Sequence, residues 1–166
     1  MSLLTRLRPA HPDERSILAE WGNAVASPYE DWGFTATGPG TRLPSTASTE
    51  ELVVADASDQ PLGSVSWRPV LYGPSLGSQA WDIGISLREE ARGHGHGRRA
   101  QRMLADWLFA TTDAHRVQAT TDVTNIAEMR ALEHAGFRVE GTLRGAQWRR
   151  GLWHDLVCFA RLRTDE

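Results

Sequence analysis

The sequence predicts an α/β domain with a mixed sheet, and three observations carry this prediction. Segments with the alternating period of a strand are interleaved with three segments whose apolar residues recur at helical spacing. Short turns join the strand-like segments of the first half, which favours antiparallel neighbours, whereas helices separate those of the second half. Apolar residues form 40% and charged residues 23% of the 166 residues, as in an ordinary globular chain. Because no internal repeat or linker divides the chain, residues 1–166 are expected to form a single domain.

Seven segments are predicted as strands because their apolar residues alternate or because they are rich in β-branched and aromatic residues. They are residues 3–8, 51–56, 63–71, 81–87, 116–121, 137–144 and 152–162. Residues 27–50 hold many Gly, Pro, Ser and Thr residues, so this stretch is expected to be a loop with at most one short helix.

Three helices are predicted from apolar residues that share one helical face. The first begins near Pro12, since proline is tolerated in the first turn and the acids that follow favour the positive end of a helix. The third is capped by a residue within 122–125 and ends at Gly136, in the position after the C-cap that favours glycine. The second follows residues 88–97, and its predicted buried face comprises Ala100, Met103, Leu104, Trp107 and Leu108.

Charge and residue usage exclude several classes of function. The net charge of −3 argues against a dedicated nucleic-acid or polybasic membrane protein. All 18 basic residues are arginine, which excludes lysine Schiff bases and a Walker A phosphate loop. A single cysteine, Cys158, excludes a disulfide framework and a cysteine-based zinc site. No apolar run approaches the length of a membrane span and no signal peptide is visible, so a cytoplasmic protein is expected.

The most informative segment is the glycine-rich stretch between a predicted strand and the second helix. Gly93, Gly95 and Gly97 allow the backbone to approach an anion closely, and the helix that follows adds the partial positive charge of its N-terminus. Neighbouring arginines add formal charge, so a phosphate or pyrophosphate site is predicted rather than a plain flexible turn. The dinucleotide fingerprint G-x-G-x-x-A is also satisfied, but residues 88–93 separate it from the strand and too few residues follow for a doubly wound sheet.

The run from Arg92 to Gly97 resembles the R/Q-x-x-G-x-G/A signature of the GNAT superfamily of N-acetyltransferases. The resemblance covers nearly the whole chain, with Asn125 opening the next helix and Gly136-Phe137 closing it. It implies acetyl-coenzyme A (acetyl-CoA) as the acyl donor, and no metal.

Residues 141–155 resemble the Rim-type branch of that superfamily, which includes ribosomal-protein-alanine acetyltransferases and enzymes that acetylate small amines. The resemblance implies the GNAT fold, a central mixed, mostly antiparallel sheet of about seven strands flanked by about four helices. Strands 4 and 5 of this fold, here residues 81–87 and 116–121, are expected to splay apart so that a thioester enters the gap.

The resemblance also assigns the donor site by position. The signature loop is expected to hold the pyrophosphate through its backbone, and the strand before it to bind the pantetheine arm through main-chain groups. The implied cofactor-binding residues are Ile85, Ser86, Leu87, Arg92, Gly93, His94, Gly95, His96, Gly97, Arg98 and Asn125. For Asn125, a plain helix N-cap is the alternative.

Asp82 is the expected general base, because Rim-like relatives often carry an acidic residue at this strand position. An alkyl amine with a pKa of about 10.4 is neutral in roughly one molecule in 2,500 at pH 7, so a proton must leave before or during attack. A strand N–H near Ile85 is expected to stabilise the oxyanion. Relatives protonate the leaving thiolate from a Tyr or a Ser, where this chain has Leu132 and Glu128. Glu128 is therefore the candidate acid if burial raises its pKa, and a solvent-facing carboxylate is the alternative for both acids.

Aromatic residues are the candidates for the wall of the acceptor pocket, and core packing is the alternative for each. They are Trp21, Tyr29, Trp32, Phe34, Trp67 and Trp153. His94 and His96 have no nearby carboxylate at ligand spacing, so no metal site is expected.

These observations predict an acetyl-CoA-dependent N-acetyltransferase that moves an acetyl group to a primary amine of a small molecule, by direct attack in a ternary complex. Three alternatives stay open. They are an acyltransferase whose donor is aminoacyl-transfer RNA or a carrier-protein thioester, a protein N-terminal acetyltransferase, and a non-catalytic module that senses coenzyme A. The expected partner is a small amine. The net charge disfavours a nucleic-acid partner, although it does not exclude transfer RNA as the donor. No membrane partner is expected, and a homodimer is expected by family analogy only.

Overall fold

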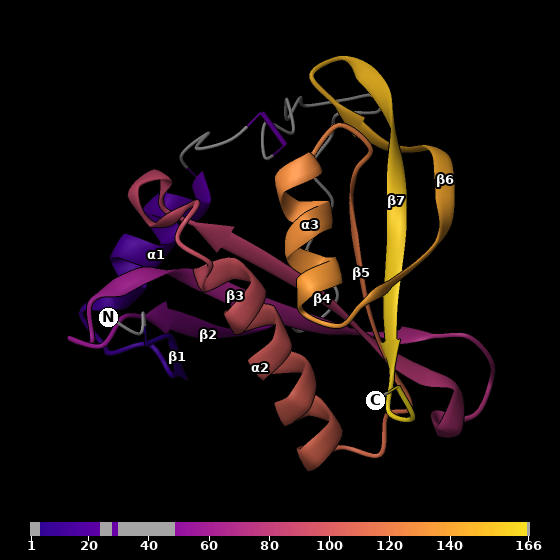
Figure 1. Ribbon diagram of the computed structural model, residues 1–166, viewed down its shortest axis with the longest axis horizontal. Helices are drawn as coiled ribbons and strands as arrows, with labels where there is room; N and C mark the ends of the chain where they lie inside the picture. The colour runs from indigo at the N-terminus through magenta and orange to yellow at the C-terminus, as the bar shows by residue number, and fades with distance from the viewer. Residues whose placement is uncertain (1–3, 24–27, 30–48, 166) are drawn as a thin grey trace.

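The computed structural model, which describes residues 4–23, 28–29 and 49–165, contains a seven-stranded mixed sheet (Figure 1). The strands lie in the order β1-β2-β3-β4-β5-β7-β6. Their bounds are Arg6–Arg8 for β1, Glu50–Ala55 for β2, Pro61–Leu71 for β3, Gln79–Leu87 for β4, Arg116–Asp122 for β5, Arg138–Arg149 for β6 and Leu152–Leu162 for β7. The predicted α/β class and the mixed sheet are confirmed.

Three α-helices lie within the described ranges, together with two short 3₁₀ turns. They are α1 (Glu14–Asn23), α2 (His96–Thr111) and α3 (Ile126–His134), and the 3₁₀ turns span Leu76–Ser78 and Glu89–Ala91. About four helices were expected, and the optional helix within residues 27–50 would fall largely on residues 30–48, which lie outside the described residues. The third helix ends as predicted, because Gly136 has a φ of +94° and the Phe137 N–H donates to the carbonyl of Leu132.

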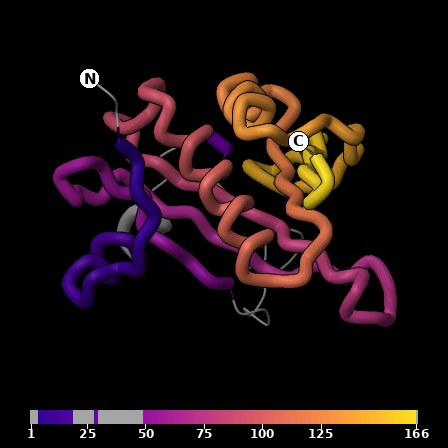
Figure 2. Tube along the Cα trace, turned by 60° about the horizontal axis from the view of Figure 1, so that its bottom comes forward, coloured from indigo at the N-terminus to yellow at the C-terminus, as the bar shows by residue number. Residues whose placement is uncertain are grey.

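The hydrophobic core lies between the sheet and helices α2 and α3. Figure 2 shows α2 running across one face of the sheet. Leu104 and Leu108 of α2 are fully buried and belong to one cluster with Val65 of β3 and Val117 of β5. Burial of this apolar stripe is what fixes α2, and with it the glycine-rich loop at its N-terminus, against β4.

The buried stripe of α2 is turned slightly from the predicted one. Met103 and Trp107 were expected on the core face but are partly exposed, whereas Gln101 and Ala105 are fully buried. The side of α2 that contains these two residues faces α3. A helix that packs against both a sheet and a second helix buries a broader stripe of its surface than one that packs against a sheet alone.

The strand ladder opens between β4 and β5, the one parallel pair among the strands that the structure describes. These strands pair only at Trp81 with Val117 and at Asp82 with Gln118. Beyond that point they diverge, as Figure 1 shows, while β4 keeps its pairing with β3 as far as Leu87. The predicted splay of the fourth and fifth strands is therefore confirmed, and its apex lies at Asp82.

Strand β6 runs five residues further than predicted, to Arg149. Its ladder with β7 slips between Leu143 and Gln147, where Gly145 has a φ of +56°. A glycine that suggests a turn in the sequence is thus accommodated as a bulge inside a long edge strand.

Candidate active site

The loop before α2 presents free backbone N–H groups at the open end of the splay. Gly93 and Gly95 have φ values of +76° and +78°, a left-handed conformation that favours glycine. Gly95 is the N-cap of α2 and supplies no side-chain cap, so the first N–H groups of the helix, from His96 to Arg98, lack intrahelical acceptors. These donors and the helix dipole can hold an anion such as a diphosphate.

Two side chains fix this loop from behind. Arg92 Nε donates to the carbonyl oxygen of Leu87 at 2.9 Å, which fastens the loop to the end of β4. The buried His96 ring lies with Nδ1 3.0 Å from Thr5 Oγ1, next to β1. Burial, together with the charge of Arg99, lowers the pKa of His96, so the neutral ring is favoured there. The exposed Arg98 side chain lies on the outer side of the loop.

The last residues of β4 lie beside the loop, beyond the end of the β4–β5 ladder. Ile85, Ser86 and Leu87 are half-buried and continue the antiparallel ladder with β3. A Cβ added at Gly97 would lie 3.6 Å from Leu87 Cδ1 and 3.8 Å from Ile85 Cδ1, so the first turn of α2 packs directly on this strand end. The main chain of β4 is therefore open toward the splay, where an extended ligand can add hydrogen bonds as a strand would.

Asn125 is the N-cap of α3. Its Oδ1 accepts from the N–H of Glu128 at 3.3 Å, and its Nδ2 donates to Thr121 Oγ1 at 3.1 Å. The structure therefore shows the capping role that was the alternative for this residue, and it places the cap between β5 and α3, on the opposite side of the splay from the glycine loop.

Glu128 lies between the first turns of α2 and α3. Its half-buried carboxyl group interacts with the fully buried Gln101, whose Nε2 also contacts the carbonyl of Gly97 at 3.4 Å. Burial raises the pKa of Glu128 to about 7, although the Gln101 hydrogen bond lowers it. The group can thus carry a proton near neutral pH, as the expected acid requires. Leu132, at the family's tyrosine position, is fully buried in the core.

Asp82, the expected base, marks the apex of the splay and its side chain is 12% exposed. Arg68 donates to its Oδ2 from Nε at 3.0 Å and from Nη2 at 2.8 Å. Gln118 Nε2 lies 3.5 Å from Oδ1. Two hydrogen bonds from Arg68 therefore fix the orientation of the carboxylate, and its Oδ1 faces Gln118.

A buried ionic cluster that the sequence did not reveal lies where β5 ends. Asp122 pairs with Arg149, which is only 3% exposed, and lies 3.1 Å from His154 Nδ1. Burial would raise the pKa of Asp122, but hydrogen bonds from Thr124 and Arg149 outweigh it and lower that pKa to about 2. No sequence signal joins these residues, because they come from three separate segments.

The cluster also fixes Tyr29, one of the expected pocket residues. The Arg149 guanidinium lies 5.6 Å from the centre of the Tyr29 ring, and the Tyr29 hydroxyl donates to the carbonyl of Thr124 at 3.2 Å. Tyr29 therefore lies against the β5 end of the splay.

Two of the other expected aromatic residues, Trp67 and Trp153, have described side chains, and they lie in different surroundings. Trp67 is 4% exposed and packs edge-on against Trp107 at 5.2 Å between ring centres, so the prediction for this residue is corrected to core packing. Trp153 is 60% exposed and stacks edge-on against Trp148 at 5.3 Å. The backbone of Trp21 lies in α1. Residues 32 and 34, the remaining Trp and Phe, lie outside the described residues.

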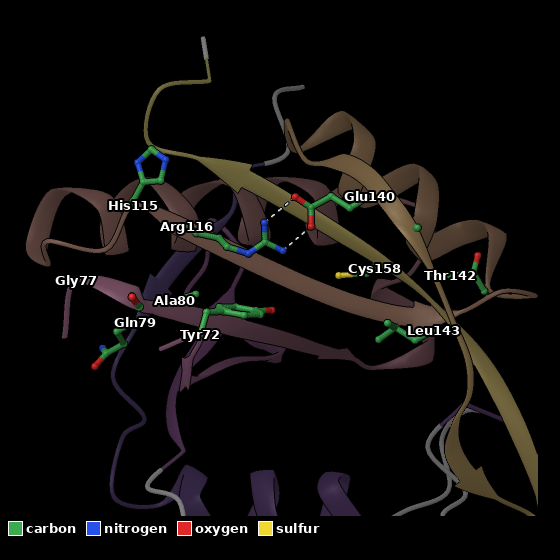
Figure 3. Close-up of a pocket in the computed structure, with 12 residues that line it drawn as sticks. Tyr72, Gly77, Gln79, Ala80, His115, Arg116, Glu140, Thr142, Leu143 and Cys158 are labelled. Carbon is green, nitrogen blue, oxygen red and sulfur yellow. Dashed lines mark hydrogen bonds and ion pairs between the residues drawn. The ribbon is translucent and has the colours of Figure 1, made fainter. Parts of the chain in front are cut away.

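A cavity of about 730 Å³ lies between the β3–β4 turn and the edge strand β6. Figure 3 shows the Arg116 guanidinium in it, between the ring of Tyr72 and the carboxylate of Glu140. Cys158 of β7 lies on its floor, and burial raises the pKa of this thiol, which keeps it protonated. Sequence reasoning missed this cavity, since its residues come from five strands or turns.

The described part of the chain holds no cluster of three or more His, Cys, Asp or Glu side chains that could bind a metal. No helix in the described ranges is long and apolar enough to cross a membrane.

Comparison with known proteins identifies the family. Residues 5–138 match the family model described as an acetyltransferase (GNAT) domain. The probable N-acetyltransferase YjcK of Bacillus subtilis (strain 168) is 32% identical over 110 residues, which are 66% of this chain and 59% of that protein. This chain therefore aligns with somewhat over half the length of that relative.

Solved structures give the same fold. Spermidine N-acetyltransferase from Vibrio cholerae, in complex with CoA and spermine, superposes with a TM-score of 0.76 at 19% identity, covering 97% of this chain and 96% of that one. Ribosomal-protein-S5-alanine acetyltransferase from Vibrio fischeri superposes with a TM-score of 0.62 at 27% identity, covering 70% and 63%. The second match supports the Rim-type branch. With the splayed strands, the glycine loop and a family model that spans most of its length, the chain belongs to the GNAT family of acetyltransferases.

Proposed function

We propose that the protein transfers an acetyl group from acetyl-CoA to a primary amine of a small molecule, by direct attack in a ternary complex. The observation that carries this proposal is the open ladder between β4 and β5. The gap closes at Asp82, and a helix N-terminus with free N–H groups lies at its open end. Such a gap exposes strand groups for an extended ligand and leads from an anion site to a carboxylate.

The donor fits the groups on the two sides of the gap. The N–H groups from His96 to Arg98 would hold the pyrophosphate, and the main chain from Ile85 to Leu87 would bind the pantetheine amides. Asn125 would flank the arm from α3. Bound acetyl-CoA supplies an activated acyl group whose thiolate is a good leaving group.

Proton transfer falls to the two carboxyl groups. Asp82 lies at the apex of the splay, where the amine would meet the thioester, and it removes the proton through a water that Gln118 can also contact. A β4 N–H near Ile85 stabilises the oxyanion. Glu128, whose pKa lies at about 7, is protonated in roughly half of the molecules at neutral pH and supplies the proton to sulfur.

Calorimetric titration with acetyl-CoA tests the donor site. Gly95→Val should abolish binding, because φ is +78° there and a side chain would contact Arg98 Nε at 3.3 Å. Gly151→Val is the matched control, since Gly151 has the same φ of +78° but lies in the β6–β7 turn with open space around its Cβ. Equal acetyl-CoA affinity in the two variants, or no binding by the wild type at millimolar ligand, would refute the proposed donor site.

One alternative has an observation of its own. The 27% match to a ribosomal-protein-S5-alanine acetyltransferase favours a protein N-terminus as the acceptor. Acetylation of an alanine-initiated peptide, in preference to every small amine tested, would select this alternative. If neither acceptor class causes release of coenzyme A, the alternative that remains is a binding module without transfer activity.

A further inference from the structure

The cavity between the β3–β4 turn and β6 adjoins the apex of the splay. Gln118 lies at their junction, because its Oε1 accepts from the Tyr72 hydroxyl at 2.5 Å while its Nε2 faces Asp82 Oδ1 at 3.5 Å. Tyr72 lines the cavity, so one hydrogen-bonded chain joins the cavity wall to the expected base. On the floor, Cys158 is the direct cross-strand partner of Thr120, two residues beyond Gln118 toward the opening of the splay.

The lining of the cavity is largely uncharged. Tyr72, Ala80, Leu143 and Cys158 provide apolar or weakly polar surface from four different segments. Tyr72 and Leu143 are also among the exposed large hydrophobic side chains of the chain, so apolar surface continues to the rim of the cavity.

Arg116 and Glu140 neutralise each other within this lining. The two groups form a two-pronged ion pair, with distances of 2.6 Å from Nη1 to Oε1 and 2.5 Å from Nη2 to Oε2. Hydrogen bonding to Arg116 lowers the pKa of Glu140, which keeps the pair ionised. Among the described residues that line the cavity, no carboxylate is left to receive a ligand ammonium group.

We propose that this cavity binds the uncharged, apolar body of a monoamine acceptor, an alkylamine or arylalkylamine whose single amino group points toward Asp82. The proposal rests on the proposed function. A volume of about 730 Å³ is in the range of cavities that hold drug-sized ligands. A polyamine would place its additional ammonium groups against Tyr72 and Leu143, where no carboxylate can replace their lost hydration.

A homologous series of acceptors tests this assignment. The n-alkylamines from propylamine to hexylamine differ only in the length of the apolar chain. Burial of each methylene should raise kcat/KM with acetyl-CoA by about fourfold until the cavity is filled. Hexylamine should also exceed 1,6-diaminohexane, which has the same length and a second ammonium group, by at least about tenfold. A flat series, or preference for the diamine or for spermidine, would overturn the proposal.

A pair of variants locates the effect. Leu143→Asp places an unpaired carboxylate in the cavity wall and should shift preference from hexylamine to 1,6-diaminohexane. Leu152→Asp is the matched control, since Leu152 is an exposed leucine on β7 outside the cavity lining, and it should keep the wild-type preference. Equal preferences in the two variants would refute the location.

Binding separates this inference from the proposed function. Calorimetric titration of the CoA-loaded protein with the same alkylamines should give affinities that rise with chain length. If the affinities rise but no amine is acetylated, the proposed function fails and the cavity assignment stands. If amines are acetylated without dependence on chain length, the cavity assignment fails alone.

Discussion

Replacement of Glu128 by Gln should stabilise the protein above neutral pH. A pKa raised from 4.5 to about 7 corresponds to about 3 kcal/mol, because one pKa unit is worth about 1.4 kcal/mol. Since the folded-state pKa is the higher one, this stabilisation is fully present below pH 4.5 and is lost as the pH rises toward 7. Glutamine keeps the hydrogen bond to Gln101 and never ionises, so Glu128→Gln avoids the loss.

Urea unfolding at pH 5 and pH 8 measures the effect. The stability advantage of Glu128→Gln over the wild type should grow by roughly 2–3 kcal/mol between these pH values. Thermal unfolding should show a rise of roughly 6–12 °C at pH 8, at about 2–4 °C per kcal/mol for a chain of this length. Glu133→Gln is the control, because Glu133 is an exposed glutamate on the same helix.

Identical pH profiles for Glu128→Gln and Glu133→Gln would refute the reasoning, because they would show that Glu128 is hydrated as a surface group is. Destabilisation by Glu128→Gln at both pH values would refute it as well. It would show that the carboxyl group makes favourable contacts in the folded protein that outweigh the cost of its burial.

Three further outcomes are expected. Asp82→Asn should lower kcat/KM for amines by about 10²-fold or more while acetyl-CoA affinity by calorimetry stays unchanged, and normal turnover from pH 6 to 9 would exclude it as the base. Arg149→Met should lower the free energy of unfolding in urea by about 3–5 kcal/mol, because Asp122 would be left charged and buried. Adding Asp122→Asn should recover much of this loss, and a double variant as unstable as Arg149→Met would contradict the reasoning. Because the pKa of His96 is lowered in the folded protein, the wild type should lose stability as the pH falls below 6.5. His96→Asn can still accept a hydrogen bond from Thr5 and should not show this loss. Melting temperatures that fall in parallel with pH in the two proteins would contradict the prediction.

Local patterns in the sequence carried most of the fold. The glycines before α2 and after α3 mark positive φ values, and alternation located the strands to within a few residues. The position of Trp67 was predictable too, because it alternates in phase with the core residue Val65. The predicted end of the sixth strand at residue 144 was wrong, because the strand continues through a bulge to Arg149.

The side-chain contacts around β5, where the acceptor is proposed to bind, could not be derived from local patterns. Asp122 meets Arg149 across 27 positions of the chain, and Gln118 meets Asp82 across 36, so only the strand order brings them together. Glu128 shows the same limit, because its burial depends on Gln101 from another helix and not on its own place in the helical period.

Because the β4–β5 ladder ends early, a ligand bound in the gap would make the stability of the fold depend on the concentration of that ligand. Beyond Asp82 no described strand pairs with the inner edge of β4, so an extended ligand bound there would take the place of an eighth strand. A free ligand concentration of about a hundred times the dissociation constant would add about 2.7 kcal/mol to the free energy of unfolding. If the gap binds acetyl-CoA as proposed, the lifetime of this protein in a cell should follow the supply of that thioester, with turnover by proteases fastest when it is scarce.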